Sequence, residues 1–526
     1  MSVFVVSSDQ SLGLQDSETY TLRVNAPTTI IHATNVFGAL RAMESLFQLA
    51  TEIRLSDDDD NDDDDGDNND LAHVHPEVAE ALAFNRHHRH HRGKWRHGSR
   101  LVIINETSVW DSPRFRHRGL LIDTARHYLP TSIIKTHLDA MEASKMNVLH
   151  WHLTDDESFP LATSQTPELA RCGAFSTAAT YTSDDVDEVV EYARARGIRV
   201  IPEIDTPGHV ASWARAHPEI VTRCGGGSEA PRLGPLNPAE NGTYTVLWQL
   251  LREVASLFPD AFMHVGGDEV EVGCWLQDPG VVAWMEEQEF GRDVGKVLEY
   301  HMQRVIGLAE AAGKEAIVWQ DVMDEEGWGV GEGLPKSTIV QVWKWSKDLV
   351  GGGDKGAGKS SRRKSRRALH MASKTSSSLY ASSTQGDSSY WLSELAHVTK
   401  THRAILSAPW YINLAPSGDA SVWKSYYTVE PLDFKAGIDQ KDMVIGGEAC
   451  VWGEQVDETN SVSKTWPLAA AVAERLWSEE QVRDVEEAED RLRAFRCRLL
   501  ARGVEAAPLW PDYCRGGNGS DSGVDA

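Results

Sequence analysis

The chain has 526 residues and is 41% hydrophobic, which is enough for one large catalytic domain and a smaller second one. Its formal net charge is -27, and because affinity for nucleic-acid phosphates comes mainly from clustered Lys and Arg, we expect no nucleic-acid partner. No run of about 18 or more apolar residues occurs, so no membrane span is predicted.

The first 112 residues predict a small α/β domain. Residues 19–25 alternate polar and apolar side chains, as in a strand, and residues 35–48 form an amphipathic helical pattern that Asn35 can cap. Between about 56 and 99 lie a run of aspartates and then a cluster of His and Arg. We interpret this low-complexity stretch as a disordered surface insertion rather than as a metal site.

From residue 113 onward, short apolar runs alternate with helical patterns. Helical patterns cover residues 132–145, 184–195, 244–258 and 297–312, and eight apolar runs begin at Gly119, Asn147, Ile198, Phe262, Ala316, Ile339, Ala404 and Met443. The predicted fold class is therefore α/β, with a (β/α)8 TIM-barrel catalytic domain over residues 113–526 and a smaller N-terminal α/β domain over residues 1–112. A Gly-, Ser- and basic-rich stretch at about 351–389 predicts a second disordered insertion, and the chain after residue 514 a disordered tail.

Acidic and aromatic side chains follow these apolar runs. The carboxyl ends of the strands carry the active site in a TIM barrel, and the residues there include Asp123, Arg126, His150, His152, Asp155, Asp156, Glu203, Asp205, His209, Asp268, Glu269, Trp319, Asp321, Trp343, Tyr411, Asn413, Glu448, Trp452 and Glu454. Aromatic rings cover the apolar face of a pyranose and charged groups bind its hydroxyls, so this rim predicts a site for a small glycan or glycoconjugate. Metal binding by His150, His152, Asp155 and Asp156 is the competing interpretation, but an open set of ligands is not apparent, and we expect neither metal nor cofactor.

Six motifs, in order along the chain, carry a family resemblance. They are His117-Arg-Gly-Leu-Leu-Ile-Asp-Thr-Ala-Arg-His-Tyr, His150-Trp-His-Leu-Thr-Asp-Asp, Asp205-Thr-Pro-Gly-His, His264-Val-Gly-Gly-Asp-Glu-Val, Ser407-Ala-Pro-Trp-Tyr-Ile-Asn and Gly446-Gly-Glu-Ala-Cys-Val-Trp-Gly-Glu. From about residue 17 to residue 514, apart from the two insertions, the chain resembles family 20 glycoside hydrolases, in particular the lysosomal-type β-N-acetylhexosaminidases. The resemblance implies an exo-acting enzyme that removes terminal non-reducing β-linked N-acetylglucosamine or N-acetylgalactosamine.

The family's mechanism, which the resemblance implies here, is retaining and substrate-assisted. The substrate's own 2-acetamido oxygen attacks the anomeric carbon and forms an oxazolinium intermediate. Glu269 then serves as acid and base, while Asp268 holds the acetamido N–H. Because neighbouring side chains diverge on a regular strand, we expect this pair on an irregular strand end, where Gly266 and Gly267 give the backbone the required freedom.

The resemblance also assigns the remaining substrate contacts. Tyr411 hydrogen-bonds the acetamido oxygen, Trp319, Trp343 and Trp452 enclose the acetyl group and ring, Arg126, Asp155 and Glu454 hold hydroxyls, and His209, with Asp205 behind it, supports the acid and base. Family members that accept 6-sulfated sugars carry Asn-Arg at the positions of Asn413 and Leu414, whereas neutral-preferring members carry Asp-Leu. Since the Arg is missing here and Asn413 avoids the repulsion of an Asp, we expect mainly neutral substrates.

Cysteines and sequons bear on the compartment. The resemblance implies Cys224–Cys274 and Cys497–Cys514 disulfides, with Cys172 and Cys450 unpaired, and N-x-S/T sequons at Asn105, Asn241 and Asn518 are candidate glycosylation sites. Disulfides indicate an oxidising compartment, so we expect a lysosomal or secreted protein. The resemblance further implies that the protein forms a homodimer. The opening apolar run at residues 1–6 is too short for a secretory leader, and the family's N-terminal domain begins earlier, so we expect the leader and part of that domain to be missing.

Two alternative functions stay open at this point. The same barrel can serve a chitooligosaccharide- or N-glycan-directed hexosaminidase or a lacto-N-biosidase. A non-catalytic sugar-binding barrel would keep the Trp residues and lose the acid chemistry, but Asp268, Glu269 and Tyr411 are all present, which favours an enzyme.

Overall fold

The computed structural model describes residues 1–54, 100–225, 232–323, 333–345, 389–416, 419, 421–511 and 513–514. Four predicted features lie outside these residues. They are the insertion at about 56–99, the second insertion apart from its last residue, the tail after residue 514 and the sequon at Asn518.

Eight parallel strands close into a barrel, in the order β12-β13-β14-β15-β16-β7-β8-β9. Their bounds are β7 (His117–Asp123), β8 (Val148–His152), β9 (Arg199–Glu203), β12 (Phe262–His264), β13 (Glu315–Trp319), β14 (Ile339–Val342), β15 (Arg403–Leu406) and β16 (Val444–Val451). Each strand overlaps the apolar run predicted for it. The TIM-barrel prediction is thereby confirmed.

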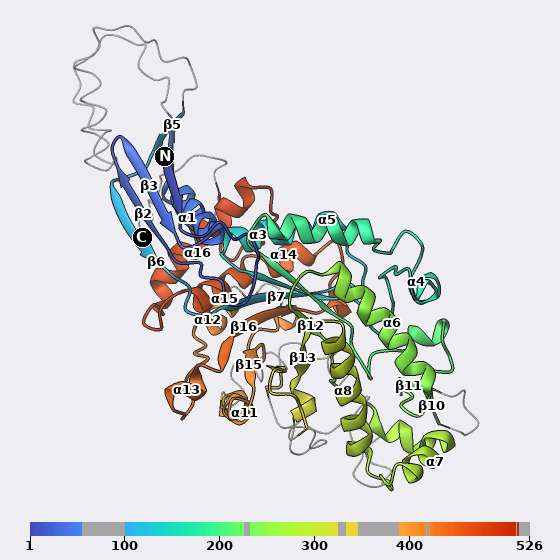
Figure 1. Ribbon diagram of the computed structural model, residues 1–526. Coiled ribbons are helices and arrows are strands. Elements are labelled where there is room, and N and C mark those ends of the chain that lie inside the picture. The colour runs from blue at the N-terminus through green and yellow to red at the C-terminus, as the bar shows by residue number, and fades with distance from the viewer. Residues whose placement is uncertain are drawn as a thin grey trace, which may run out of the picture.

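Helices surround the strands, as Figure 1 shows for α3, α5, α6 and α8. These four overlap the four predicted helical patterns. The helices are α3 (Thr131–Ala143), α4 (Pro167–Gly173), α5 (Ser183–Arg194), α6 (Asn241–Leu257), α7 (Pro279–Glu287), α8 (Val294–Ala311), α11 (Ser389–Val398), α12 (Val422–Tyr427), α13 (Ile438–Lys441), α14 (Ser461–Thr465), α15 (Leu468–Trp477) and α16 (Val485–Ala501). Short 3-10 turns follow several of the strands, at η2 (Trp213–Arg215), η3 (Val272–Gln277), η4 (Gln320–Met323), η7 (Ile412–Leu414) and η8 (Gly453–Gln455). Outside the barrel, β10 (Val221–Cys224) pairs with β11 (Arg232–Leu236) in a hairpin.

The barrel interior changes from apolar to polar along its axis. Near the amino ends of the strands, one side chain from each of seven strands packs with Leu14 of the N-terminal segment; the strand residues are Val148, Ile201, Phe262, Ile317, Ile339, Ile405 and Ile445. Two residues further along β8 and β9, on the same face of each strand, stand the buried His150 and Glu203. The carboxyl half of the interior is therefore lined with charge, directly beneath the rim.

The N-terminal region forms a four-stranded sheet of order β1-β3-β2-β6 that lies beside α15 and α16 (Figure 1). Its elements are β1 (Ser2–Val5), β2 (Tyr20–Asn25), β3 (Thr28–Ala33), α1 (Val36–Leu49), β4 (Thr51–Arg54), β5 (Arg100–Ile103) and β6 (Thr107–Asp111), with β4 and β5 paired separately. As predicted, Asn35 caps α1 by accepting the N–H of Gly38. The predicted domain boundary at residues 112–113 lies between β6, which ends at Asp111, and β7, which begins at His117. The division of the chain into these two domains stays a prediction.

A buried ion network joins this sheet to the barrel. Glu18 Oε1 accepts from Arg41 Nε of α1 at 2.8 Å, and Glu18 Oε2 accepts from Arg118 of β7 at 2.5 Å. All three side chains are buried, so the junction is held by charges that water does not screen. Within the described ranges, no helix has both the length and the apolarity needed to cross a membrane.

Candidate active site

Asp268 and Glu269 follow β12 on an irregular turn. Gly266 and Gly267 have φ values of 74° and 106°, and Glu269 itself has φ 48°, in the left-handed region that side chains rarely adopt. A Cβ at Gly266 would lie 1.6 Å from Asp205 Oδ1, so only glycine fits there. This turn allows two neighbouring carboxyl groups to approach the same histidine.

The Asp268 carboxyl is largely enclosed. Its Oδ2 lies 3.6 Å from Nε2 of His209, and no group of the described residues hydrogen-bonds to its Oδ1. Burial, together with the nearby carboxyls of Asp321 and Glu269, raises the pKa of Asp268 to about 7, although His209 acts in the opposite direction. An unpaired buried oxygen is costly, so this atom is suited to meet a donor from a bound ligand.

Glu269 is more open to solvent, with its side chain 58% exposed and its Oε2 3.7 Å from His209 Nε2. Its backbone N–H donates to Asp321 Oδ1 at 3.3 Å. Asp321 also accepts from the Trp343 indole at 2.7 Å and pairs with the buried Lys344 at 2.8 Å. Asp321 and Lys344 therefore brace the turn that carries Glu269, a role that their positions in the sequence did not reveal.

His209 lies between Asp155 and the two rim carboxyls. Its Nδ1 is 3.2 Å from Asp155 Oδ1, whereas the family resemblance implies Asp205 behind it. Asp205 Oδ1 instead accepts the backbone N–H of Gly267 at 3.2 Å. Asp155 and Asp268 outweigh the effect of burial and hold the pKa of His209 well above its ordinary value.

Aromatic rings form one cluster beside these carboxyls. The cluster comprises Trp319, Trp343, Trp345, Tyr411 and Trp452 with Leu121 and Cys450. Tyr411 packs against both Trp343 and Trp345, with ring centroids 6.3 Å and 5.2 Å away. The structure thus brings together all the aromatic residues predicted for the site. It also adds Trp345, and the spacing of two residues between Trp343 and Trp345 is a sequence signal that could have indicated this residue.

Arg126 is fixed by carboxylates on both sides. Its guanidinium reaches Asp155 Oδ2 at 2.9 Å and Asp123 Oδ2 at 3.0 Å, and it lies over the Trp452 ring at 5.1 Å. Asp123 also accepts the backbone N–H of Gly453 at 2.9 Å, which ties the loop after β7 to η8. The exposed Glu454 belongs to η8 and lies close enough for its charge to act on Arg126.

Asn413 stands in η7, next to Tyr411. Its Oδ1 is buried, and no group of the described chain hydrogen-bonds to it. The neighbouring Leu414 packs against the aromatic cluster. Like Asp268, Asn413 offers an acceptor that a bound ligand can satisfy.

The two histidines that a metal site would use, His150 and His152, are engaged within the protein. His152 contacts Glu203 and Asp155 at 2.6 Å and 2.9 Å, and His150 contacts Glu448 at 2.7 Å. A metal would have to displace these pairs, and the expectation of a metal-free site stays a prediction.

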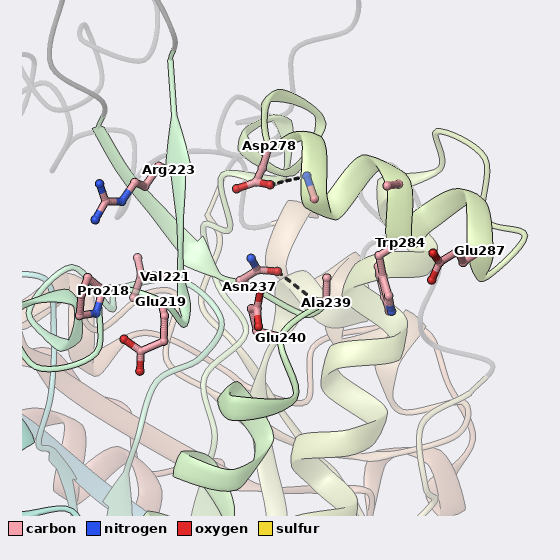
Figure 2. A pocket seen from close by; sticks show the side chains of 12 residues that line it. Pro218, Glu219, Val221, Arg223, Asn237, Ala239, Glu240, Asp278, Trp284 and Glu287 are labelled. Atoms are coloured by element: carbon pink, nitrogen blue, oxygen red, sulfur yellow. Dashed lines mark hydrogen bonds between the residues drawn. The ribbon is translucent and has the colours of Figure 1, made fainter.

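Both expected disulfides, Cys224–Cys274 and Cys497–Cys514, are present, and Cys172 and Cys450 are free. The side chains of Asn105 and Asn241 are exposed, so both sequons are accessible. A groove of about 500 Å³ lies elsewhere, between the β10–β11 hairpin and α7, and Figure 2 shows Trp284 and Asp278 among its walls. None of the predicted site residues lines it.

Comparisons with known proteins identify the family of this chain. Residues 115–480 match the model of the glycosyl hydrolase family 20 catalytic domain. The human β-hexosaminidase subunit beta is 39% identical over 503 residues, which cover 95% of this chain and 74% of that protein, and the bovine subunit alpha is 38% identical over 509 residues, covering 96% and 79%. The Flavobacterium johnsoniae chitobiase structure superposes with a TM-score of 0.69 at 27% identity, covering 95% of this chain and 62% of that one. The chain therefore belongs to glycosyl hydrolase family 20 and is a glycoside hydrolase of the β-N-acetylhexosaminidase type.

Proposed function

We propose that the enzyme removes terminal non-reducing β-linked N-acetylhexosamines by substrate-assisted, retaining hydrolysis. The observation that carries this proposal is the pairing of a largely enclosed Asp268, whose buried Oδ1 has no hydrogen-bond partner among the described residues, with an exposed Glu269 on one strained turn. The buried carboxyl is suited to hold an acetamido N–H, and the exposed one to exchange protons with the leaving group and with water.

In the first step Glu269 donates its proton to the glycosidic oxygen as the acetamido carbonyl oxygen attacks the anomeric carbon. The glycosidic bond breaks, the leaving group departs as an alcohol, and an oxazolinium ion forms. In the second step water attacks the anomeric carbon, Glu269 takes up the proton of that water, and the acetamido group is restored. Two inversions at the anomeric carbon give net retention.

The surrounding side chains serve to fix the acetamido group. Asp268 accepts its N–H, and the Tyr411 hydroxyl donates to its oxygen. Trp319, Trp343 and Trp452 enclose the methyl group and the sugar ring, in a cluster whose side chains are each less than one-tenth exposed. A restrained acetamido group attacks intramolecularly, which is worth roughly 7–11 kcal/mol in favourable systems.

Hydroxyl recognition belongs to the other side of the site. Arg126, already paired with Asp155, and the exposed Glu454 are placed to bind sugar hydroxyls, while His209 supports Glu269 from 3.7 Å. Asn413 offers an uncharged oxygen near the sugar. Since neither an Arg nor an Asp stands at positions 413–414, we propose that neutral substrates are preferred over 6-sulfated ones.

We propose a lysosomal or secreted location and a homodimeric state. Two disulfides and two accessible sequons support a passage through an oxidising compartment. The relatives named above are described as subunits, which supports assembly, and light scattering coupled to size-exclusion chromatography gives the mass that tests it.

The mechanism is tested with paired aryl glycosides that differ only at C2. We expect rapid hydrolysis of the 2-acetamido substrate, almost none of the 2-hydroxy substrate, and tight inhibition by a thiazoline that mimics the oxazolinium ion. Asp268→Asn should depress turnover of the 2-acetamido substrate, because the charged partner of its N–H is lost. Equal hydrolysis of both glycosides, without thiazoline inhibition, would exclude substrate assistance and leave the barrel assignment intact.

A further inference from the structure

A chain of alternating imidazoles and carboxylates runs from the rim into the barrel. We define the acid–imidazole chain as His209, Asp155, His152, Glu203, His150 and Glu448. Its successive links measure 3.2, 2.9, 2.6, 3.0 and 2.7 Å. Every member except His209 is almost fully buried, so these contacts are not weakened by water.

His152 must carry two ring protons to make its contacts. Its Nδ1 faces Glu203 and its Nε2 faces Asp155, both at hydrogen-bond distance. Ionised carboxylates only accept hydrogen bonds, so the ring has to donate at both nitrogens, as only an imidazolium can. The charge on His152 thus depends on the carboxylate at its inner end.

We propose that Glu203 is a positioning residue for hydrolysis, which acts through His152 to hold Asp155 ionised and oriented between Arg126 and His209. This inference rests on the proposed function, because the roles of Asp155 and His209 at the reacting sugar come from there. Glu203 itself is fully buried, so it acts through its neighbours.

The surroundings of Glu203 are built to keep it anionic. Its Oε1 accepts from the Trp319 indole at 2.7 Å, and its Oε2 faces His150 and His152 at 3.0 Å and 2.6 Å. Despite complete burial, His152, His264 and His150 hold its pKa well below the ordinary value. His264 Nδ1 lies 3.1 Å from Glu203 Oε1 and also accepts the backbone N–H of Gly266 at 3.1 Å.

Other charges face His152 from the packed strands. Asp123 of β7 and Asp155 of the loop after β8 join Glu203 in raising the pKa of the ring well above its ordinary value, against the effect of burial. On the inner side stand His150 and Glu448. Of these groups, Glu203 is the one that contacts His152 opposite Asp155.

The test compares the pH dependence of kcat/KM for the wild type and Glu203→Gln, on an aryl N-acetylhexosaminide. Without the inner carboxylate, His152 should release one proton, and Asp155 loses the positive charge beside it. The coupled group of Asp155, His209 and Asp268 then holds its protons more tightly, so both limbs of the profile should move to higher pH by about 0.5–1 unit. If His152 kept its proton, the variant would only lose a negative charge, and both limbs would move to lower pH.

Glu448→Gln is the matched control. It removes the same charge from the same buried interior, but one imidazole further from His152, which keeps both of its carboxylate partners. We expect a shift less than half of that in Glu203→Gln. Equal shifts in the two variants, an unchanged profile or a downward shift in Glu203→Gln would each overturn the proposal.

A second measurement needs no substitution. With histidine labelled by 15N in the wild-type enzyme, at least one solvent-protected ring should carry protons on both nitrogens at about pH 7. Absence of any such ring would refute the inference even if Glu203→Gln failed to fold. A wild type without activity on the aryl substrate would instead refute the proposed function, so the two failures are distinguishable.

Discussion

Two rim residues, His209 and Glu269, hold left-handed backbone conformations, with φ 57° and 48°. Such conformations cost about 1–3 kcal/mol each and persist where surrounding contacts enforce them. Here they direct His209 Nε2 toward both Asp268 and Glu269, at 3.6 Å and 3.7 Å. The strain is therefore located where proton exchange with the substrate is proposed to occur.

Replacing Glu269 by Gln keeps the shape of the side chain and removes the proton donor. We expect kcat to fall by about 10²–10⁴ on an unactivated disaccharide while KM changes little. An aryl substrate with an acidic phenol should suffer less in the first step, because its leaving group needs less protonation. The comparison of both substrates by steady-state kinetics checks this.

Glu271→Gln is the control for that substitution, since Glu271 lies on the same loop and pairs at the surface with Arg232. It should leave both kinetic constants within about twofold of the wild type, as surface pairs contribute little. Near-normal turnover of the disaccharide by Glu269→Gln would remove Glu269 from the role of acid.

At the level of single residues, the sequence was sufficient to predict which side chains of the site lie close together where a motif follows a barrel strand. The closeness of Asp268, Glu269, Tyr411 and the Trp rings could be predicted because strand ends of a barrel converge. The partner of His209 could not, because whether Asp155 or Asp205 meets its Nδ1 depends on the path of two loops. Trp345 was missed although its spacing of two residues from Trp343 could have indicated it.

Among the described elements, the turn after β12 is tightly constrained. A methyl group at Gly266 would overlap the Asp205 carboxylate, with 1.6 Å between Cβ and Oδ1, and φ 74° is unfavourable for alanine. We expect Gly266→Ala to lower the melting temperature and to reduce kcat at least about tenfold, because Asp268 and Glu269 must shift with the backbone. Differential scanning fluorimetry and kinetics measure both effects.

Gly273→Ala, in η3 a few residues later, provides the comparison. Nothing lies within 4 Å of a Cβ there, so stability and kcat should stay close to wild type. A harmless Gly266→Ala would show that the turn can relax without loss of function.

Helix α8 carries a buried histidine, His301, whose two ring nitrogens have no hydrogen-bond partner among the described residues. Burial lowers its pKa from 6.5 to about 3. Because the pKa of His301 is lower in the folded state, the unfolded state binds a proton more readily once the pH falls below the unfolded pKa of 6.5. The unfolding free energy then falls by about 1.4 kcal/mol per pH unit until the pH reaches the folded pKa. The folded protein should therefore be less stable in an acidic compartment than at neutral pH.

His301→Leu should remove that dependence. Between about pH 7 and pH 5, the variant should lose about 2 kcal/mol less unfolding free energy than the wild type. Urea unfolding at the two pH values gives the difference directly. Parallel losses in both proteins would show that His301 does not titrate on unfolding in this range.

The elements of the barrel were easier to predict than those of the N-terminal sheet. Every barrel strand carries an apolar run and is followed by a polar rim, whereas β3 and β6 alternate weakly; β3 pairs with both β1 and β2, and β6 pairs with β2. The pairing of β6 with β2 spans more than about 80 residues and leaves no local signal, and β3 lacks a clear period-2 pattern, so only β2 and α1 could be predicted there.

At the scale of the whole molecule, the junction between sheet and barrel rests on Glu18. Arg41 and Arg118 are 1% and 0% exposed, and both pair with this one carboxylate. Glu18→Gln would leave two buried cations without their anion, and we expect a loss of about 3–5 kcal/mol in unfolding free energy. Because the junction lies at the amino ends of the strands, KM at moderate temperature should not change.

The exposed pair between Arg194 and Glu191 on α5 serves as the reference for that loss. Glu191→Gln should cost no more than about 0.5 kcal/mol. A comparable small effect for Glu18→Gln in chemical denaturation would mean that water or a rearrangement compensates the two arginines.

The Cys224–Cys274 disulfide joins the β10–β11 hairpin to η3, which follows directly on the loop that carries Glu269. A cross-link of this kind typically adds about 2–4 kcal/mol, and here it acts on the segment that must hold the catalytic turn. The choice of expression host therefore matters for this enzyme. Material made in a reducing cytoplasm can contain the complete polypeptide and still lack this restraint, so its specific activity reports on oxidative folding as much as on the chemistry of the site.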